Sequence, residues 1–425
     1  IKTPYSHVLN FVVGRDLPHN FGFEAAFVTR LGRNLLIRRD LAQPVNLVDT
    51  KSGMDYFTAA KTIIEAAKNA GIPTGAAIAA YAGLAPIPYW ENLFPAAGYG
   101  GYTATQRIAR QYNRYSPDYL TAIWAMDQYC SPGCSIFGKY AYFNGQFDAL
   151  VAQSSIARAD YRSLQLTLRK RWSEGYQFDL NYTLSKSMDH GSDLERGATW
   201  GNAGYGGYSG IVINPFDLDM QWGPSDFDVR HQMNLNWIAN FPLGREARFG
   251  RSLPGWLNAV IGDWSMAGVY RWTSGFPFNV INARSAWATN WQVQGNAELV
   301  DPNKLPETKT TKNVINGYPS PFADPKTAIT FFRYDYPGEG GKRNYLRGDG
   351  YFNIDFSLSK AWSMPGGRLR FRWDTFNVTN SVRFSTAGLT MYPDRQPTFG
   401  RYNNSLSTCD GRAGRCMQFA LHYEF

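Results

Sequence analysis

Residues 162–187 read RSLQLTLRKRWSEGYQFDLNYTLSKS, and this stretch decides the fold. Every second residue is apolar on both sides of the short segment 173–175: first Leu164, Leu166 and Leu168, then Tyr176, Phe178, Leu180, Tyr182 and Leu184. The positions between them are mostly polar. A period of two over runs of this length predicts two β-strands joined by a tight turn, each with one apolar and one polar face.

The same unit recurs along the chain. Two alternating runs surround the turn at 17–20, and single runs occupy 230–241, 263–272, 351–362, 367–376 and 416–425. The sequence therefore predicts nine strands. The last run, CMQFALHYEF, ends on an aromatic residue, with Phe419, Leu421, Tyr423 and Phe425 on one face.

The eight connections between these strands alternate in length. Residues 16–20, 173–175, 242–262 and 364–367 form the shorter set, whereas 32–158, 188–228, 275–350 and 378–413 form the longer set. Outer-membrane barrels have tight periplasmic turns and long external loops, but loop lengths in a soluble sandwich need not follow strand parity. The pattern favours an all-β fold, a transmembrane antiparallel β-barrel in the bacterial outer membrane.

Lipid supplies no hydrogen bonds, so a sheet spans it only when closed, with apolar side chains outward. A soluble β-sandwich produces the same period of two. Aromatic residues at strand ends favour the membrane interpretation because interfacial girdles are rich in them. The candidate girdle residues are Trp172, Tyr176, Trp264, Trp272 and Trp362.

Composition excludes several classes. Mean hydropathy is −0.37, and the most apolar stretch, 70–90, is broken by three prolines, so it predicts loop and short helix rather than a membrane helix. The net charge of +9 is scattered without a basic run, so nucleic acid is not an expected partner. The histidines are dispersed and residues 338–342 lack Walker spacing, so we expect neither an enzyme nor a cofactor or metal site.

Four cysteines form two close pairs, Cys130 with Cys134 and Cys409 with Cys416. Their spacing predicts two local disulfides in an oxidising compartment. The alternative, a zinc site, needs the two pairs to converge and lacks the spacing of a zinc knuckle.

The connection 32–158 is too long for a structureless loop and predicts its own elements. We expect a helix at 54–71 ended by Gly71, and a second at 116–130 with Ser116 as N-cap and Pro117 at the first helical position. Together they predict a helical cap. The aromatic residues either stack on a sugar or peptide ligand or pack within the loops: Tyr89, Trp90, Tyr99, Tyr102 and those of segment 201–210.

Arg368, Arg370 and Arg372 share the polar face of one strand and form a basic ladder. The ladder either guides an anionic solute or meets an acidic plug surface. The alternative is a set of internal ion pairs with Asp374, Asp355 or the plug.

Six segments together resemble the C-terminal barrel half of Oar-like TonB-dependent receptors: 3–28, 161–189, 227–245, 257–280, 342–362 and 369–384. The resemblance implies a 22-stranded barrel, an N-terminal plug and a TonB box that couples import to an inner-membrane energy complex. Residues 1–425 are then the C-terminal part of the barrel, with 32–158 as a large extracellular insertion. Nine is an odd number of strands, so we expect the plug and N-terminal strands to lie outside this sequence.

The implied function is energised uptake of a ligand bound at extracellular loops. The implied partners are outer-membrane lipid and lipopolysaccharide, TonB through the missing N-terminal region, an unidentified ligand, and barrel-assembly machinery that recognises the final strand ending at Phe425. Two alternatives remain open: a passive porin or structural barrel within a larger envelope assembly, and a soluble secreted β-sandwich that binds carbohydrate.

Overall fold

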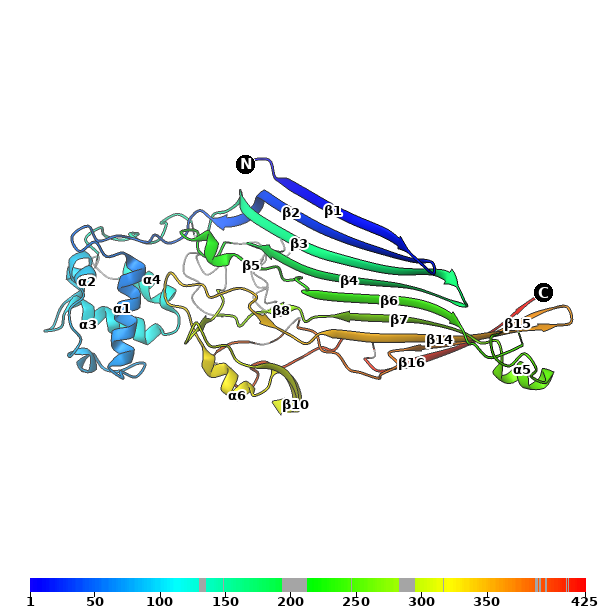
Figure 1. Cartoon of the computed structure of the whole chain (residues 1–425). Helices are drawn as coiled ribbons and strands as arrows, with labels where there is room; N and C mark the ends of the chain where they lie inside the picture. Colours follow the sequence, from blue (N-terminus) through cyan, green and yellow to red (C-terminus); the bar gives the residue numbers. More distant parts are fainter. Residues whose placement is uncertain are drawn as a thin grey trace.

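One large antiparallel sheet dominates the structure, a computed structural model that describes residues 1–129, 135–147, 149–192, 212–245, 247–282, 295–315, 317–386, 389, 391–393, 396–409, 411 and 413–425 (Figure 1). Each of its nine long strands lies beside its neighbour in sequence, which confirms the predicted strands. Their bounds are β1 (Tyr5–Leu17), β2 (Phe21–Asp40), β3 (Val151–Ser173), β4 (Tyr176–Asp189), β6 (His231–Asn240), β7 (Ser265–Thr273), β14 (Tyr351–Met364), β15 (Gly367–Phe376) and β16 (Cys416–Glu424). A short strand, β5 (Gly223–Pro224), pairs with β4.

The strand register sorts the side chains into two faces. Phe27 lies opposite Leu164, which lies opposite Leu184, and a parallel row runs from Leu17 of β1 through Phe178 and Phe356 to Met417 of β16. We call this side the apolar face. Asn181 lies opposite both Thr167 and Asn234 on the other side, the polar face. The predicted period of two is therefore confirmed.

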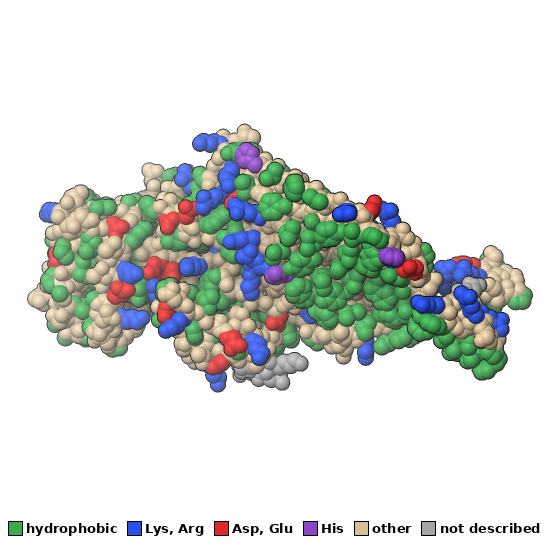
Figure 2. Space-filling view, viewed as in Figure 1, with side chains coloured by type: hydrophobic (Ala, Val, Ile, Leu, Met, Phe, Trp, Pro, Cys, Tyr) green, Lys and Arg blue, Asp and Glu red, His purple; other side chains and the backbone are tan. Residues whose placement is uncertain are grey.

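No second layer covers the apolar face in the part of the chain that the structure describes. The buried hydrophobic clusters lie in the long connections and at the far ends of β2 and β3. Leu421 of β16 is 68% exposed, and hydrophobic side chains gather over the middle of the sheet (Figure 2). A β-sandwich would bury this face against a second sheet, so the structure contradicts the soluble sandwich.

The sheet is open. Among the described residues, β1 pairs with β2 alone and β16 with β15 alone. Every residue of β1 is exposed. The outward-facing backbone N–H and C=O groups of β1 and β16 therefore have no partner strand among the described residues.

The connections alternate in space as well as in length. The turns after β1, β3 and β14 lie at one end, the turn end, together with the C-terminus and α5 (Gly255–Ile261) in the connection between β6 and β7 (Figure 1). The long connections lie at the opposite end. Their described parts, taken together, are called the loop platform below.

The first long connection is shorter than the predicted 32–158, because β2 continues to Asp40 and β3 already begins at Val151. Pairing between them shifts register from Gly32 to Leu35, where Asn34 has a φ of 54°. This bulge breaks the period of two in the sequence although the strands go on pairing.

A helical domain fills the remainder of that connection: α1 (Tyr56–Asn69), η1 (Ile78–Tyr81), α2 (Pro88–Leu93), η2 (Pro95–Ala97), α3 (Ala104–Tyr115) and α4 (Tyr119–Tyr129). The helix expected at 54–71 is confirmed, with Gly71 at a φ of 64° after its last turn. The predicted start of α4 is wrong. Asp118 replaces Ser116 as the cap, since its carboxylate, a stronger acceptor than a hydroxyl, accepts from the Thr121 amide at 3.0 Å.

The other long connections hold short elements: η3 (Leu218–Gln221), β8 (Pro277–Phe278), β9 (Glu298–Leu299), β10 (Thr308–Ile315), β11 (Tyr318–Phe322), α6 (Pro325–Ala328), η4 (Ile329–Phe331), β12 (Phe332–Arg333) and β13 (Leu346–Arg347). A cluster that includes Phe278, Phe322 and Phe399 packs the last two of these connections together. None of the helices among the described residues is long and apolar enough to cross a membrane.

Candidate functional site

The helical domain of the loop platform has its own aromatic core. Trp90 is fully buried, and its indole N–H donates to the Ala59 carbonyl at 3.3 Å. The hydroxyls of Tyr56 and Tyr112 lie 2.6 Å apart, and so do those of Tyr89 and Tyr142. These contacts hold the helices in one arrangement without the sheet beneath them.

This core decides between the two interpretations of the loop aromatics. Tyr89 and Trp90 pack inside it, so neither is available to stack on a ligand. Tyr99 is 63% exposed, but the Arg107 guanidinium already lies 3.7 Å from its ring centre. Tyr102 lies within 5.3 Å of the same guanidinium. Segment 201–210 lies outside the described residues.

Buried carboxylates fix the entry and exit of the domain. Burial alone would raise the pKa of Asp49, but hydrogen bonds from Asn92, Ser52 and two backbone amides lower it to about 2. Asp127 accepts from the backbone amides of 141, 142 and 143 at 2.8–3.3 Å, yet burial still leaves its pKa raised. The carboxylates of Asp49 and Asp127 are therefore both engaged in hydrogen bonds within the chain.

A pocket of about 280 Å³ lies between the helical domain and residues 333–336. Its lining combines aromatic walls with amide and cationic groups, among them Tyr112, Asn113, Tyr119, Lys68, Arg333 and Tyr336. Arg333 donates to both carboxylate oxygens of Glu339, at 2.6 and 3.1 Å, and lies 4.3 Å from the centre of the Tyr336 ring. A small ligand with an apolar body and acceptor oxygens fits this chemistry.

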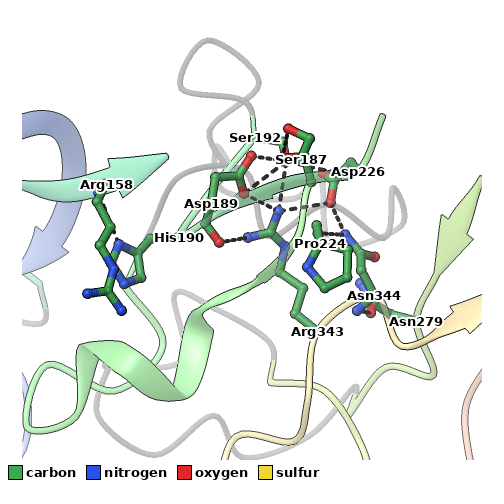
Figure 3. Close-up of polar contacts among 11 residues, drawn as sticks. Arg158, Ser187, Asp189, His190, Ser192, Pro224, Asp226, Asn279, Arg343 and Asn344 are labelled. Carbon is green, nitrogen blue, oxygen red and sulfur yellow. Dashed lines mark hydrogen bonds and ion pairs between the residues drawn. The ribbon is translucent and has the colours of Figure 1, made fainter. Parts of the chain in front are cut away.

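Arg343 anchors two other connections of the platform to the end of β4 (Figure 3). Its side chain is fully buried and donates to the carboxylate and carbonyl of Asp189, to Ser192 at 2.7 Å, and to Asp226 at 3.4 Å. Gly223 permits this approach, because a Cβ there would lie 2.8 Å from the Arg343 carbonyl oxygen.

The neighbouring residues extend this anchor. Asn344 donates to the Asp226 carboxylate at 2.6 Å and to the Pro224 carbonyl at 2.8 Å. Arg347 contacts the carboxylate of Asp228, which is itself buried. The connections after β4 and β7 are thus held together just above the sheet.

His190, immediately after β4, is buried beside this anchor. Its Nδ1 accepts from the Arg158 backbone amide at 3.1 Å, which requires a neutral ring protonated at Nε2. Nε2 lies 3.5 Å from the Asp219 carboxylate, and Trp222 packs edge-on against the ring. Burial lowers the pKa of His190 more than Asp219 raises it.

The basic ladder lies on the polar face. Arg372 Nε donates to Asp374 at 2.9 Å, and Arg370 lies 3.5 Å from Glu424. Arg368 is opposite Glu424 in the strand register. Arg372 also lines a groove of about 470 Å³ on this face together with Asp179 and Asp355. Two of the three arginines therefore have carboxylate partners within the chain.

The remaining sequence candidates fall at the strand ends. Trp172, Tyr176, Trp264 and Trp362 lie at the turn end, and Trp272 lies near the platform end of β7. A disulfide joins Cys409 to Cys416 with their Cα atoms 6.7 Å apart, as predicted. Cys130 and Cys134 lie outside the described residues. Phe419, Leu421 and Tyr423 lie opposite Trp373, Phe371 and Leu369 on the apolar face, and Phe425 follows them.

Two lysines on the apolar face were not identified as candidate site residues from the sequence. Lys170 lies opposite Phe21 and Phe178, and Lys360 lies opposite Phe371, near the turn end of their strands. Aromatic rings surround both ammonium groups: those of Phe21 and Tyr176 at 5.5 and 4.9 Å, and those of Trp264 and Trp362 at 5.8 Å each. The signal was a charged residue at an apolar position of the period-two pattern.

Comparison with protein-family models gives a match over nearly the whole chain. A family model described as an outer membrane beta barrel domain matches residues 1–418. Among curated proteins no relative was found. Among solved structures, the outer membrane transporter YddB from Escherichia coli aligns with 10% identity and a TM-score of 0.35, covering 99% of this chain and 33% of the transporter. The chain thus spans about a third of the length of that protein.

Proposed function

This chain belongs to the outer membrane beta barrel domain family and lies in the bacterial outer membrane, and from that premise we propose that it is part of a TonB-dependent receptor of the Oar-like type. Its role is to bind a ligand at the outer surface for energised uptake. The role is one of recognition and transport without catalysis.

The barrel of this receptor closes through strands that pair with β1 and β16. Hydrocarbon cannot satisfy the backbone groups at the two open edges, so each edge needs a partner strand in the membrane. A 22-stranded barrel supplies those strands and surrounds a plug domain, to which TonB binds through an N-terminal box. Barrel-assembly machinery inserts the chain, and lipopolysaccharide surrounds its outer half.

The observation that carries the proposal is the position of the loop platform. All four long connections lie at one end of the sheet, and ion pairs and aromatic cores fix their described parts. A simple pore does not need an independently packed helical domain above its mouth, whereas a receptor needs a rigid binding surface. The pocket lined by Tyr112, Tyr119 and Tyr336 is the proposed contact for the ligand.

The alternative is a passive porin or a structural barrel in an envelope assembly. The polar face and its groove are compatible with a water-filled lumen. A plugged receptor and an open porin differ in conductance, and this difference separates the two functions.

The test uses the complete protein, including whatever precedes Ile1, in planar lipid bilayers. A receptor is expected to be electrically silent and to bind the purified C-terminal domain of TonB. Deleting the N-terminal box should abolish that binding and leave the barrel folded. Stable open channels together with absence of TonB binding would contradict the receptor and support the porin.

A further inference from the structure

The connection 241–264 at the turn end, called the α5 loop below, is fixed against the apolar face by an unusual set of hydrogen bonds. The last carbonyls of a helix have no partner within it. Here Lys360 Nζ donates to the carbonyls of Asn258, at 2.8 Å, and Gly262. Trp362 Nε1 donates to Ala259 at 2.7 Å, and Trp264 Nε1 donates to Val260 at 3.0 Å.

Two of these donors, Lys360 and Trp362, come from the sheet, and Trp264 comes from the loop itself; together they hold the helix in place. Lys360 and Trp362 occupy apolar-face positions of β14. The partial negative charge at the end of α5 favours the ammonium group there. The end of the helix is therefore held by side chains of the apolar, lipid-facing side, while Gly255, Asn258 and Ala259 also line a groove that reaches the polar face.

The α5 loop turns a second apolar surface outward. Trp256 is 72% exposed and Val260, one helical turn later, is 62% exposed. Figure 2 shows this lobe beside the sheet, with hydrophobic side chains at its tip and Lys or Arg side chains next to them. Three arginines of the same loop are also exposed: Arg245, Arg248 and Arg251.

We propose that the α5 loop is an interfacial anchor that binds anionic glycerophospholipid in the inner leaflet of the outer membrane. The turn end of an outer-membrane barrel faces the periplasm, where that leaflet presents phospholipid headgroups. An apolar helix face flanked by arginines is the chemistry of an interfacial helix on anionic lipid. The guanidinium groups bind phosphate, and Trp256 enters the region between headgroups and hydrocarbon. The anchor is independent of whether the barrel is a receptor or a porin.

The test is hydrogen–deuterium exchange of residues 241–264 in nanodiscs of phosphatidylcholine alone and with added phosphatidylglycerol. Exchange should slow about fivefold or more with phosphatidylglycerol, given the attraction of each arginine to an anionic surface. R245Q/R248Q/R251Q should remove this difference, whereas the control R110Q/R114Q, in the helical domain, should retain it. W256A should speed exchange in both kinds of nanodisc. Heat-modifiable migration verifies that each variant is folded.

Three outcomes would overturn the anchor. The first is equal exchange in the two lipids, and the second is a phosphatidylglycerol effect that survives the triple substitution. The third is slow exchange that appears only when two copies of the protein share a nanodisc, because the α5 loop would then be a protein interface.

Discussion

Arg343 and Asp189 are 154 residues apart in the sequence, yet the guanidinium of one contacts the carboxylate of the other in a fully buried position. Asp189 is the last residue of β4, and Arg343 belongs to the connection that leads into β14. The pair therefore fixes the position of the loop platform relative to the sheet.

Substituting Arg343→Gln should detach the connections after β4 and β7 from the sheet. Removing one partner of a buried ion pair costs about 3–5 kcal/mol, because the other charge stays buried. Hydrogen exchange should rise in residues 186–192 and 223–228. The control Lys304→Gln breaks the exposed Lys304–Asp301 pair and should change exchange very little. Unchanged exchange near Asp189 in R343Q would show that the pair is not an anchor.

Acidification should loosen the contact between His190 and Arg158. Burial lowers the pKa of His190, so the neutral ring contributes its full stability above the ordinary value near 6.5. That contribution falls as pH drops below about 6.5 towards the lower pKa of the folded state, because the charged ring would direct Nδ1–H at the Arg158 amide. Exchange at residues 158 and 217–222 should increase between pH 7.5 and 5.5. H190N retains an acceptor without titrating, and an equal pH response in that variant would assign the effect elsewhere.

Arginine substitutions at two neighbouring positions of β4 should distinguish the lipid-facing side of the sheet from the polar side. Leu180→Arg places a charge on the apolar face at a cost of about 2–4 kcal/mol near the middle of the membrane, and folded protein in outer-membrane fractions should fall. Asn181→Arg places the same charge on the polar face. It loses one hydrogen bond to Thr167, worth about 1 kcal/mol, and should assemble nearly normally. Equal losses in both variants would argue against a lipid-facing apolar side.

Trp90→Ala should unfold the helical domain without unfolding the sheet. Truncating a fully buried tryptophan costs about 3–5 kcal/mol, and the core around Trp90 is made almost wholly by the domain itself. Circular dichroism should lose helical signal, and protease should cut between residues 41 and 150. Tyr99→Ala removes an exposed aromatic side chain and serves as the control. Loss of heat-modifiable barrel in W90A would mean that the domain and sheet fold as one unit.

Deleting Phe425 tests the proposed recognition of the last strand during assembly. Phe425 follows β16 and is fully exposed, so its removal takes away little packing within the chain. A fall in folded, membrane-inserted protein should therefore report lost recognition rather than lost stability. Substituting Lys2→Ala, just before β1, is the control. Normal amounts of folded protein after loss of Phe425 would contradict the assembly role.

Local patterns predicted the secondary structure well. The alternating runs gave nine strands and both faces, and Gly71 marked the end of α1. The two errors arose where a neighbouring residue changed the local structure that a sequence pattern predicts. Asp118 caps α4 in place of Ser116. The bulge at Asn34 interrupts the period of two, so the pattern does not predict the outer half of β2.

Some residues of the candidate site carried no readable signal. Arg343 lies in a glycine-rich connection and looks like any solvated arginine until Asp189, Ser192 and Asp226 surround it. Lys360 carried a signal that the sequence analysis did not use, a charge at an apolar position of the period-two pattern. Its partners, the carbonyls at the end of α5, cannot be found from spacing.

The sequence by itself determined which side chains share a face, because a strand alternates its side chains whatever surrounds it. The alternation of short and long connections also indicated which strand ends lie at the same end of the sheet. Only the tertiary structure decided that no second sheet covers the apolar face among the described residues, which loops hold one another, and that Lys360 and Trp362 bind the end of α5. Those properties depend on contacts between residues tens to hundreds of positions apart. A one-dimensional pattern with a period of two or three to four residues contains no record of them.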